Sequence, residues 1–265
     1  MDFCSIASGS SGNCIFVGTD HAGVLIDAGI SGKKVTEGLK GIGRKPEELD
    51  AILITHEHSD HIKGVGVLAR KYGIPIYSAP GTIHWMTEHQ ALGRIEESLF
   101  HEIHADESFM IRDLEIHPFR VSHDAAEPVA YRLQCEEKSV AVATDLGYYD
   151  EYTVDHLKNL DAVLVESNHD INMLQVGTYP YYLKQRILGS RGHLSNENAG
   201  RLLGEILHDG MKAVMLGHLS KENNYEALAY ATVCAEITMG DNPYQAEDFP
   251  IQIARRDMPS QLIAV

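Results

Sequence analysis

The sequence predicts one α/β domain in which two β-sheets carry helices on their outer faces. Short apolar runs alternate with helical stretches along the 265 residues, and β-rich stretches occur near the N-terminus and in the middle of the chain. Apolar residues make up 44% of the sequence, enough for a sizeable core. We expect a single domain over residues 1–265, with its core at about 1–220 and a C-terminal helix and strand in 221–265 packing on it.

Apolar runs bounded by turn residues define the expected strands. These strands lie at residues 3–7, 14–17, 23–27, 51–54, 75–77, 114–121, 129–135, 139–144, 162–165 and 213–216. The expected helices span residues 31–40, 65–72, 81–92, 197–207 and 225–239. Ser195 is a good N-cap for the helix at 197–207, and Asn223 or Asn224 is suited to cap the last helix.

Charge and cysteine content exclude some classes of function. The chain has 38 acidic and 22 basic residues and a formal charge of −16, which argues against nonspecific binding to nucleic acid or to an anionic membrane. No apolar run approaches the roughly 20 residues that cross a bilayer, and the N-terminus lacks a signal-peptide pattern. The four cysteines are scattered without a CxxC pair, so we expect a reduced, cytoplasmic protein. The oligomeric state stays open.

Residues 55–61 read THEHSDH and directly follow the apolar run at 51–54. Side chains alternate in an extended segment, so His56 and His58 point the same way. A turn through Ser59 then aims Asp60 and His61 at a second point nearby. Two divalent cations about 3.5–4 Å apart form a hydrolytic site, and this spacing suits such a pair. The alternative is a solvated turn rich in polar residues.

Further ligand-type residues follow apolar strands: His123, Asp145, Glu166 and His218. Sheet-based folds place ligands in crevices outside strand ends, so a shared edge would bring these side chains to the motif at 56–61. Each residue also has an ordinary explanation. His123 could bond to Asp124, Asp145 could begin a turn, and His218 could be a satisfied core histidine.

The order HxHxDH, then a lone His, a lone Asp and a His resembles the metallo-β-lactamase superfamily, over residues 1 to about 220. Six further motifs resemble the WalJ/YycJ-type proteins, small bacterial members regarded as 5′–3′ DNA exonucleases. These are SGSSGNC, VSHDAAEP, ATDLG, ESNHD, GHLSNENA and LGHLS. The resemblance implies an αββα sandwich with the site at one edge of the paired sheets.

The resemblance also implies a set of ligands for two metal ions. By this resemblance, the first ion would be held by His56, His58 and His123. The second ion would be held by Asp60, His61 and His218, and Asp145 would bridge the two ions. All seven are His or Asp, which suits Zn²⁺ or Mn²⁺ without deciding between them. Glu166 and His193 resemble the Glu and His beside the metals of the related tRNA 3′-processing nucleases.

Three residues are candidates for the catalytic steps. Two such ions lower the pKa of water towards about 7 and offset charge on a phosphate. Asp60 is a candidate for ligand and for proton acceptor. We expect His193, oriented by Glu166, to clamp a phosphate or to protonate the leaving oxygen; alternatively, His193 only decorates the start of the following helix.

Substrate contacts are expected from two further segments. Ser10 and Asn13 lie in SGSSGN, a glycine turn that either presents amides to phosphate or is a plain hairpin turn. Lys184, Arg186 and Arg191 precede His193, with tyrosines at 179, 181 and 182 nearby. Basic and aromatic side chains together can track a single strand, although such cations are often just solvated.

We therefore predict a metal-dependent phosphodiester hydrolase, a 5′–3′ exonuclease that acts on DNA rather than RNA and has no membrane partner. Two other classes stay open. One is a thioester or lactone hydrolase like glyoxalase II, which would use the same metals. The other is a metal-binding regulatory partner of a cell-wall signalling system.

Overall fold

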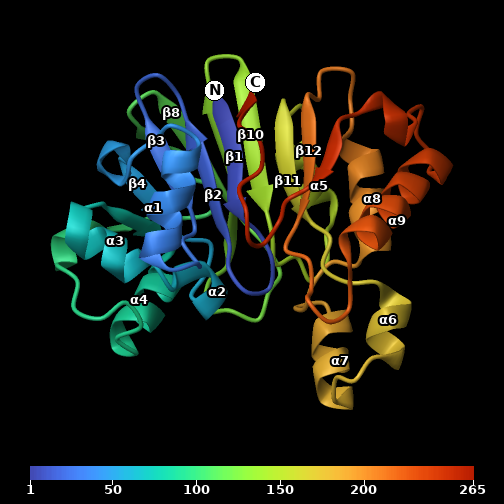
Figure 1. The fold of residues 1–265 in the computed structure, drawn as a ribbon, viewed down its shortest axis with the longest axis horizontal. Helices are drawn as coiled ribbons and strands as arrows, with labels where there is room; N and C mark the ends of the chain where they lie inside the picture. Colours follow the sequence, from blue (N-terminus) through green and yellow to red (C-terminus); the bar gives the residue numbers. More distant parts are fainter.

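Two seven-stranded sheets pack face to face with helices on both outer sides (Figure 1), in a computed structural model that describes all 265 residues. The first sheet runs β14 (Ile263–Ala264), β1 (Asp2–Ala7), β2 (Cys14–Gly18), β3 (Gly23–Ile26), β4 (Ala51–Leu53), β5 (Ile76–Ser78), β6 (Phe100–Glu102). The second sheet runs β13 (Ile251–Ile253), β12 (Ala213–Gly217), β11 (Ala162–Glu166), β10 (Lys138–Ala143), β9 (Val129–Cys135), β8 (Leu114–Arg120), β7 (Phe109–Ile111). The C-terminal segment thus adds an edge strand to each sheet.

The helices form two outer layers and a short hairpin. The helices on the first sheet are α1 (Gly32–Gly41), α3 (Val65–Tyr72) and α4 (Pro80–Glu88). Those on the second sheet are α5 (Glu151–Leu157), α8 (Asn196–Ile206) and α9 (Glu226–Met239). Three further helices are α2 (Ser59–Ile62), α6 (Ile171–Val176) and α7 (Tyr181–Leu188). No helix combines the length and apolar composition that spanning a bilayer requires.

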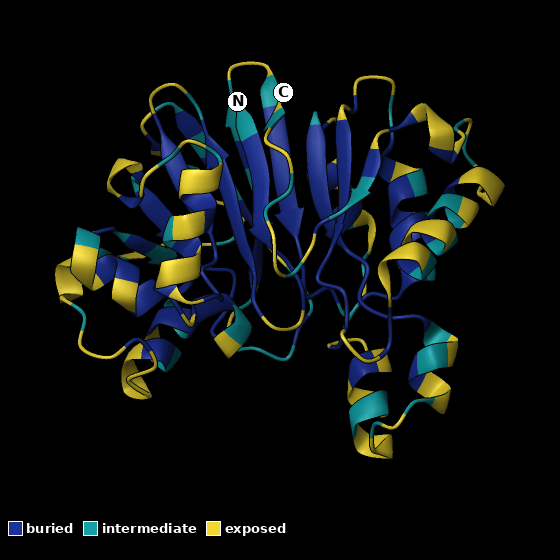
Figure 2. Ribbon diagram, in the orientation of Figure 1, coloured by how far each residue is buried: buried dark blue, intermediate teal, exposed yellow.

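Alternation along the strands divides the apolar side chains among three cores. Ala162 and Leu164 of β11 enter the core between the sheets, whereas Val163 and Val165 face the outer helices. In β3, Leu25 faces outward while its neighbours face the second sheet. Because these strands are buried on both faces, as Figure 2 shows, they read as continuous apolar runs rather than as alternating ones.

Parallel pairing brings the functional strand ends together. β3 pairs in parallel with β4, and β10, β11 and β12 are parallel neighbours. Carboxyl ends of parallel strands meet at one edge, so the loops that follow these five strands share one end of the sandwich. The αββα arrangement expected from the sequence is confirmed. The loops after β4, β10 and β12 contain residues 56–61, Asp145 and His218, and His123 follows β8.

Two local predictions were wrong. The helix predicted over 81–92 ends at Glu88, since Gln90 adopts a left-handed φ of 49° that an α-helix cannot contain. The N-cap of α9 is Tyr225 rather than an asparagine. Asn224 is buried, and its amide donates to the carbonyl of Ser167 at 3.0 Å and to Asn196 Oδ1 at 2.8 Å.

Candidate active site

The HxHxDH motif begins just after β4 and ends inside α2. His56 and His58 lie in the extended segment before the helix, and the amide of His61 donates to the carbonyl of His58 at 2.9 Å. This turn aims Asp60 and His61 at a second group of donor atoms, while the ring of His61 stays 4.1 Å from that of His56. The ring centroids of His56 and His58 are 4.6 Å apart.

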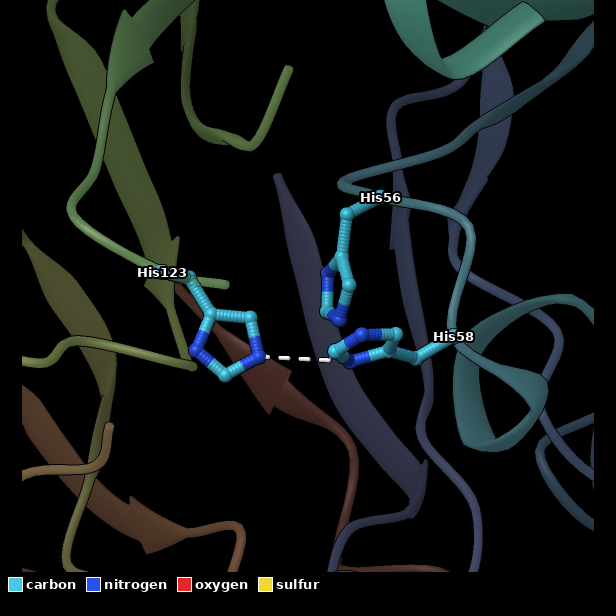
Figure 3. A group of neighbouring side chains, drawn as sticks. All are labelled: His56, His58 and His123. Carbon is cyan, nitrogen blue, oxygen red and sulfur yellow. Dashed lines mark hydrogen bonds between the residues drawn. The ribbon is translucent and has the colours of Figure 1, made fainter. Parts of the chain in front are cut away.

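The first group of donor atoms comes from both sheets. His123 follows β8, and its Nε2 lies 3.3 Å from Nδ1 of His58. Figure 3 shows His56, His58 and His123 turned towards one common point. Their ligand atoms lie within 4.8 Å of one another. Two ring nitrogens at such a distance need a proton or a cation between them.

The second group contains Asp60, His61 and His218, whose ligand atoms are equally close. Oδ2 of Asp60 lies 3.3 Å from Nε2 of His218 and 3.6 Å from Nε2 of His61. His218 follows β12, so this group also joins the two sheets.

Asp145 lies between the two groups. Its Oδ2 is 3.1 Å from Nε2 of His61, and its Oδ1 is 3.5 Å from Nε2 of His123. A carboxylate in this position can serve both groups, since Oδ1 also lies 3.6 Å from Nε2 of His218. The structure therefore brings all seven predicted ligands to one place at the end of the sandwich.

Buried partners orient four of the histidines through Nδ1. Asp27 Oδ2 accepts from His61 at 2.7 Å, and the carbonyl of Gly192 accepts from His123 at 3.0 Å. Thr55 Oγ1 donates to Asp27 and therefore accepts from Nδ1 of His56, 3.0 Å away. Because each of these Nδ1 atoms carries the proton, Nε2 is left as a lone pair that faces the site.

Glu166 orients the fourth of these histidines, His218, and also His193. Its Oε1 lies 2.8 Å from Nδ1 of His193 and 2.8 Å from Nδ1 of His218. Its Oε2 accepts the amides of Leu146 and Leu194 at 2.7 and 3.0 Å. Glu166 is fully buried and both of its oxygens accept hydrogen bonds, so it is a positioning residue for two histidines.

The polar groups at the site fit a divalent cation. Nε2 of His56 and Oδ2 of Asp145 are buried and form no hydrogen bond. Unpaired buried polar atoms are uncommon, and here they point at the other donors. The set of imidazole and carboxylate donors, without a thiolate, suits a divalent metal ion.

Nearby carboxylates together affect the pKa of His218 and His193 more strongly than burial does. Burial lowers the pKa of His218, but Asp145, Asp60 and Glu166 raise it to about 10. Burial raises the pKa of Glu166, but His193 and His218 lower it to about 2. Burial alone would lower the pKa of His193, but Glu166 and Asp145 together have the larger effect and raise this pKa. Protons on these rings balance the carboxylates where a cation is not bound.

Three residues of the site adopt left-handed backbone conformations within two residues of the ends of their strands. Asp27, Asp145 and His218 have φ values of 59°, 59° and 55°. This conformation is uncommon for residues other than glycine and is found where function constrains the chain. It turns each side chain sideways from its strand end into the site.

The predicted substrate contacts fall into two groups. Ser10 is exposed in the turn at 8–13, whereas Asn13 is fully buried, with Nδ2 3.2 Å from Nε2 of His61. Asn13 therefore holds the turn against the site and is not accessible to substrate. Lys184, Arg186 and Arg191 lie on or just after α7.

Sequence reasoning missed Asp27 and Thr55. Asp27 follows the apolar strand β3 in the same way that Asp145 follows β10. The strand-end criterion that selected Asp145 would therefore have selected Asp27 too. Thr55 carried no comparable signal, because its role depends on the hydroxyl of a buried side chain between two partners.

Comparison with known proteins identifies the family. A model of the beta-lactamase superfamily domain matches residues 23–218. The chain belongs to the metallo-β-lactamase superfamily. The resemblance seen in the sequence motifs is thus confirmed, and the matched region contains all seven donor residues.

Within this superfamily, two relatives are similar over most of their length. Exodeoxyribonuclease WalJ of Streptococcus pneumoniae is 46% identical over 236 residues, 89% of this chain and 88% of that protein. Exodeoxyribonuclease YycJ of Bacillus anthracis is 40% identical over 233 residues, 88% of each. Both names agree with the predicted class of enzyme, a metal-dependent nuclease of the metallo-β-lactamase superfamily.

A solved structure shares the same metallo-β-lactamase fold. Zn²⁺-bound PqqB from Methylobacterium extorquens superposes with a TM-score of 0.71 over 98% of this chain and 100% of that one. Only 16% of the aligned residues are identical, so this likeness concerns the fold alone.

Proposed function

We propose that this protein is an exodeoxyribonuclease that degrades DNA from 5′ ends with two bound divalent ions, zinc or manganese. The proposal depends on one observation. His193 is bonded to the buried carboxylate of Glu166 and lies beside the seven His and Asp donors. The proposal is supported by two exodeoxyribonucleases to which the chain is 46% and 40% identical over nearly nine tenths of its length.

The ions would be held by the two groups of side chains described above, with Asp145 between them. When bound, they supply activated water at neutral pH and neutralise charge on the phosphate. Asp27, Thr55 and the carbonyl of Gly192 keep the Nε2 lone pairs of their histidines aimed at the site. This preorganisation is the contribution of the protein to binding the ions.

Asp60 is suited to accept the proton of the attacking water. Its side chain is 23% exposed, whereas that of Asp145 is 3% exposed. Its Oδ2 faces His218 and His61, and the remaining carboxylate oxygen is available to a water molecule at the solvent side. Asp60 therefore combines the roles of ligand and general base.

His193 is suited to protonate the leaving oxygen or to clamp the phosphate. Nδ1 of His193 donates to Oε1 of Glu166, which leaves Nε2 as the atom that meets substrate. Its side chain is 18% exposed, so solvent and substrate reach this ring. The ring centroid lies 5.1 Å from that of His123, so His193 would reach a phosphate bound beside His123.

The names of the relatives support the choice of substrate, and the free cysteines support the choice of compartment. We favour DNA over RNA because both relatives are named for deoxyribonuclease activity. A DNA substrate and four free cysteines favour the cytoplasm.

A substrate panel with metal analysis tests the proposal. Metal-loaded protein of known Zn and Mn content is incubated with 5′- and 3′-labelled single-stranded and duplex DNA, with RNA, and with a thioester. We expect about two ions per chain and release of mononucleotides from the 5′ end of DNA. Turnover of the thioester alone would replace this proposal with a glyoxalase II-like activity. Binding of metal without turnover of any substrate would favour a regulatory role.

A further inference from the structure

The chain between Glu166 and His193 forms a helical hairpin that projects from the layered body. Helices α6 and α7 extend away from the sandwich at the same end as α2, which contains Asp60 and His61 (Figure 1). Figure 2 shows that much of the hairpin surface is exposed. The hairpin therefore begins just after Glu166 and ends just before His193, the residue proposed to protonate the leaving oxygen or to clamp the phosphate.

The hairpin is anchored against the site rather than loosely attached. Arg186 forms an ion pair with Asp124, with Nη2 and Oδ1 3.0 Å apart, and Asp124 lies 3.4 Å from Nε2 of His123. The amide of His193 donates to the carbonyl of Ile187 at 3.0 Å. Lys184 Nζ donates to the carbonyls of Gln175 and Gly177, which ties α7 to the end of α6.

The outer surface of the hairpin carries aromatic side chains without packing partners. Tyr181 and Tyr182 are 77% and 74% exposed, and Val176 is 87% exposed. Only Leu174 and Ile187 are buried among the residues of the two helices. Large side chains grouped on a projecting element have no role in the core, and such exposed patches mark binding sites.

The charge of this segment is opposite to that of the chain. Residues 171–192 contain three basic and no acidic residues, whereas the whole chain has a formal charge of −16. Arg186 is paired with Asp124, but Lys184 contacts only carbonyls, and Arg191 donates to the carbonyl of His123 at 3.1 Å. Two positive charges are therefore left without a carboxylate partner, that of Lys184 on the hairpin and that of Arg191 beside His123. Such a surface complements a polyanion rather than another copy of this acidic chain.

We propose that the α6–α7 hairpin is a platform for an unpaired segment of the nucleic-acid strand whose end is cut. Tyr181 and Tyr182 stack on bases, Lys184 meets a phosphate along the hairpin, and Arg191 meets one beside His123. Base stacking on aromatic rings tolerates every sequence, which suits an exonuclease that meets all four bases in turn. This inference rests on the proposed nuclease function and specifies how its substrate is held.

The test compares a Tyr181→Ala/Tyr182→Ala variant with Tyr181→Phe/Tyr182→Phe in the full-length, metal-loaded protein. Tyr230→Ala, an exposed tyrosine of α9, is the matched control. The probes are a 20-residue oligothymidylate and bis(p-nitrophenyl) phosphate, a small diester that lacks bases. We expect the double alanine variant to raise KM for the oligonucleotide about tenfold or more, while both the phenylalanine variant and the control stay close to wild type.

The ratio of the two activities separates this role from a structural one. A local defect at the site would lower kcat/KM of both substrates equally, whereas loss of a platform lowers the ratio of oligonucleotide to small-diester kcat/KM. An unchanged ratio in the double alanine variant would overturn the platform. A change in oligomeric state by sedimentation, with an unchanged ratio, would assign the tyrosines to self-association instead. If wild type hydrolyses neither probe, the nuclease proposal itself fails.

Discussion

Nδ1 of His61 lies 2.7 Å from Oδ2 of Asp27, and both side chains are completely shielded from solvent. The second oxygen of Asp27 accepts the amide of Thr55 at 2.9 Å, so this carboxylate fixes both the ring and the start of the HxHxDH motif. A buried pair of this kind sets which nitrogen of His61 faces the site. Metal affinity should therefore depend on a residue that touches no metal.

We expect Asp27→Asn to weaken metal binding by about 10- to 100-fold, because partners of ligating histidines contribute at this scale. Affinity is measured by competition with a chromophoric chelator. Asp50→Asn is the matched control, since Asp50 binds the amide of Gly23 at the other end of β3. Equal metal affinities of the two variants would remove Asp27 from this role.

His193→Ala should lower turnover by about 10²- to 10⁴-fold, the usual contribution of a general acid, while metal content stays unchanged. His193 lies outside the two groups of donors proposed for the ions, so its loss leaves them intact. Steady-state kinetics and elemental analysis of the same preparation test this. His84→Ala, at an exposed position on α4, serves as control. Loss of metal in the His193 variant would contradict the assignment.

Removal of metal should lower thermal stability. Ligand at 100 times its Kd stabilises the folded state by about 2.7 kcal/mol, which for a chain of this size corresponds to roughly 5–10 °C in Tm. Thermal unfolding is followed by circular dichroism after dialysis against EDTA, with and without added Zn²⁺ or Mn²⁺. His56→Ala should show a smaller increase on adding metal. Identical melting curves for both forms of the wild type would argue against a metal centre.

Gly29→Ala should displace the second half of the metal motif. A Cβ at Gly29 would lie 1.6 Å from the carbonyl oxygen of Asp60, a contact that only movement of the backbone relieves. We expect destabilisation of about 3 kcal/mol and reduced metal binding, since overpacking costs are of this order. Gly41→Ala, which meets nothing within 4 Å, should be neutral. Urea unfolding and metal titration of both variants measure the difference.

Regular backbone periodicity explains why much of the fold could be predicted. The strand predicted at residues 129–135 and the helix at 65–72 have those bounds in the structure, because burial on one or both faces leaves a repeating apolar pattern. The short edge strand β6 was not predicted, and β14 lies in the segment 221–265, for which one strand was predicted without bounds. Their residues are mostly exposed, so no such pattern marks them.

By itself, the sequence determined the two-sheet α/β architecture and the side chains that meet at its end, because ligand-type residues directly after apolar strands must share the edge where parallel strands end. Only the tertiary structure decided which partner each histidine has, that Asn13 and Asn224 are interior, and that α6 and α7 project beside His193. These features depend on contacts between residues far apart in the chain, such as Asp27 and His61, and no local spacing encodes them.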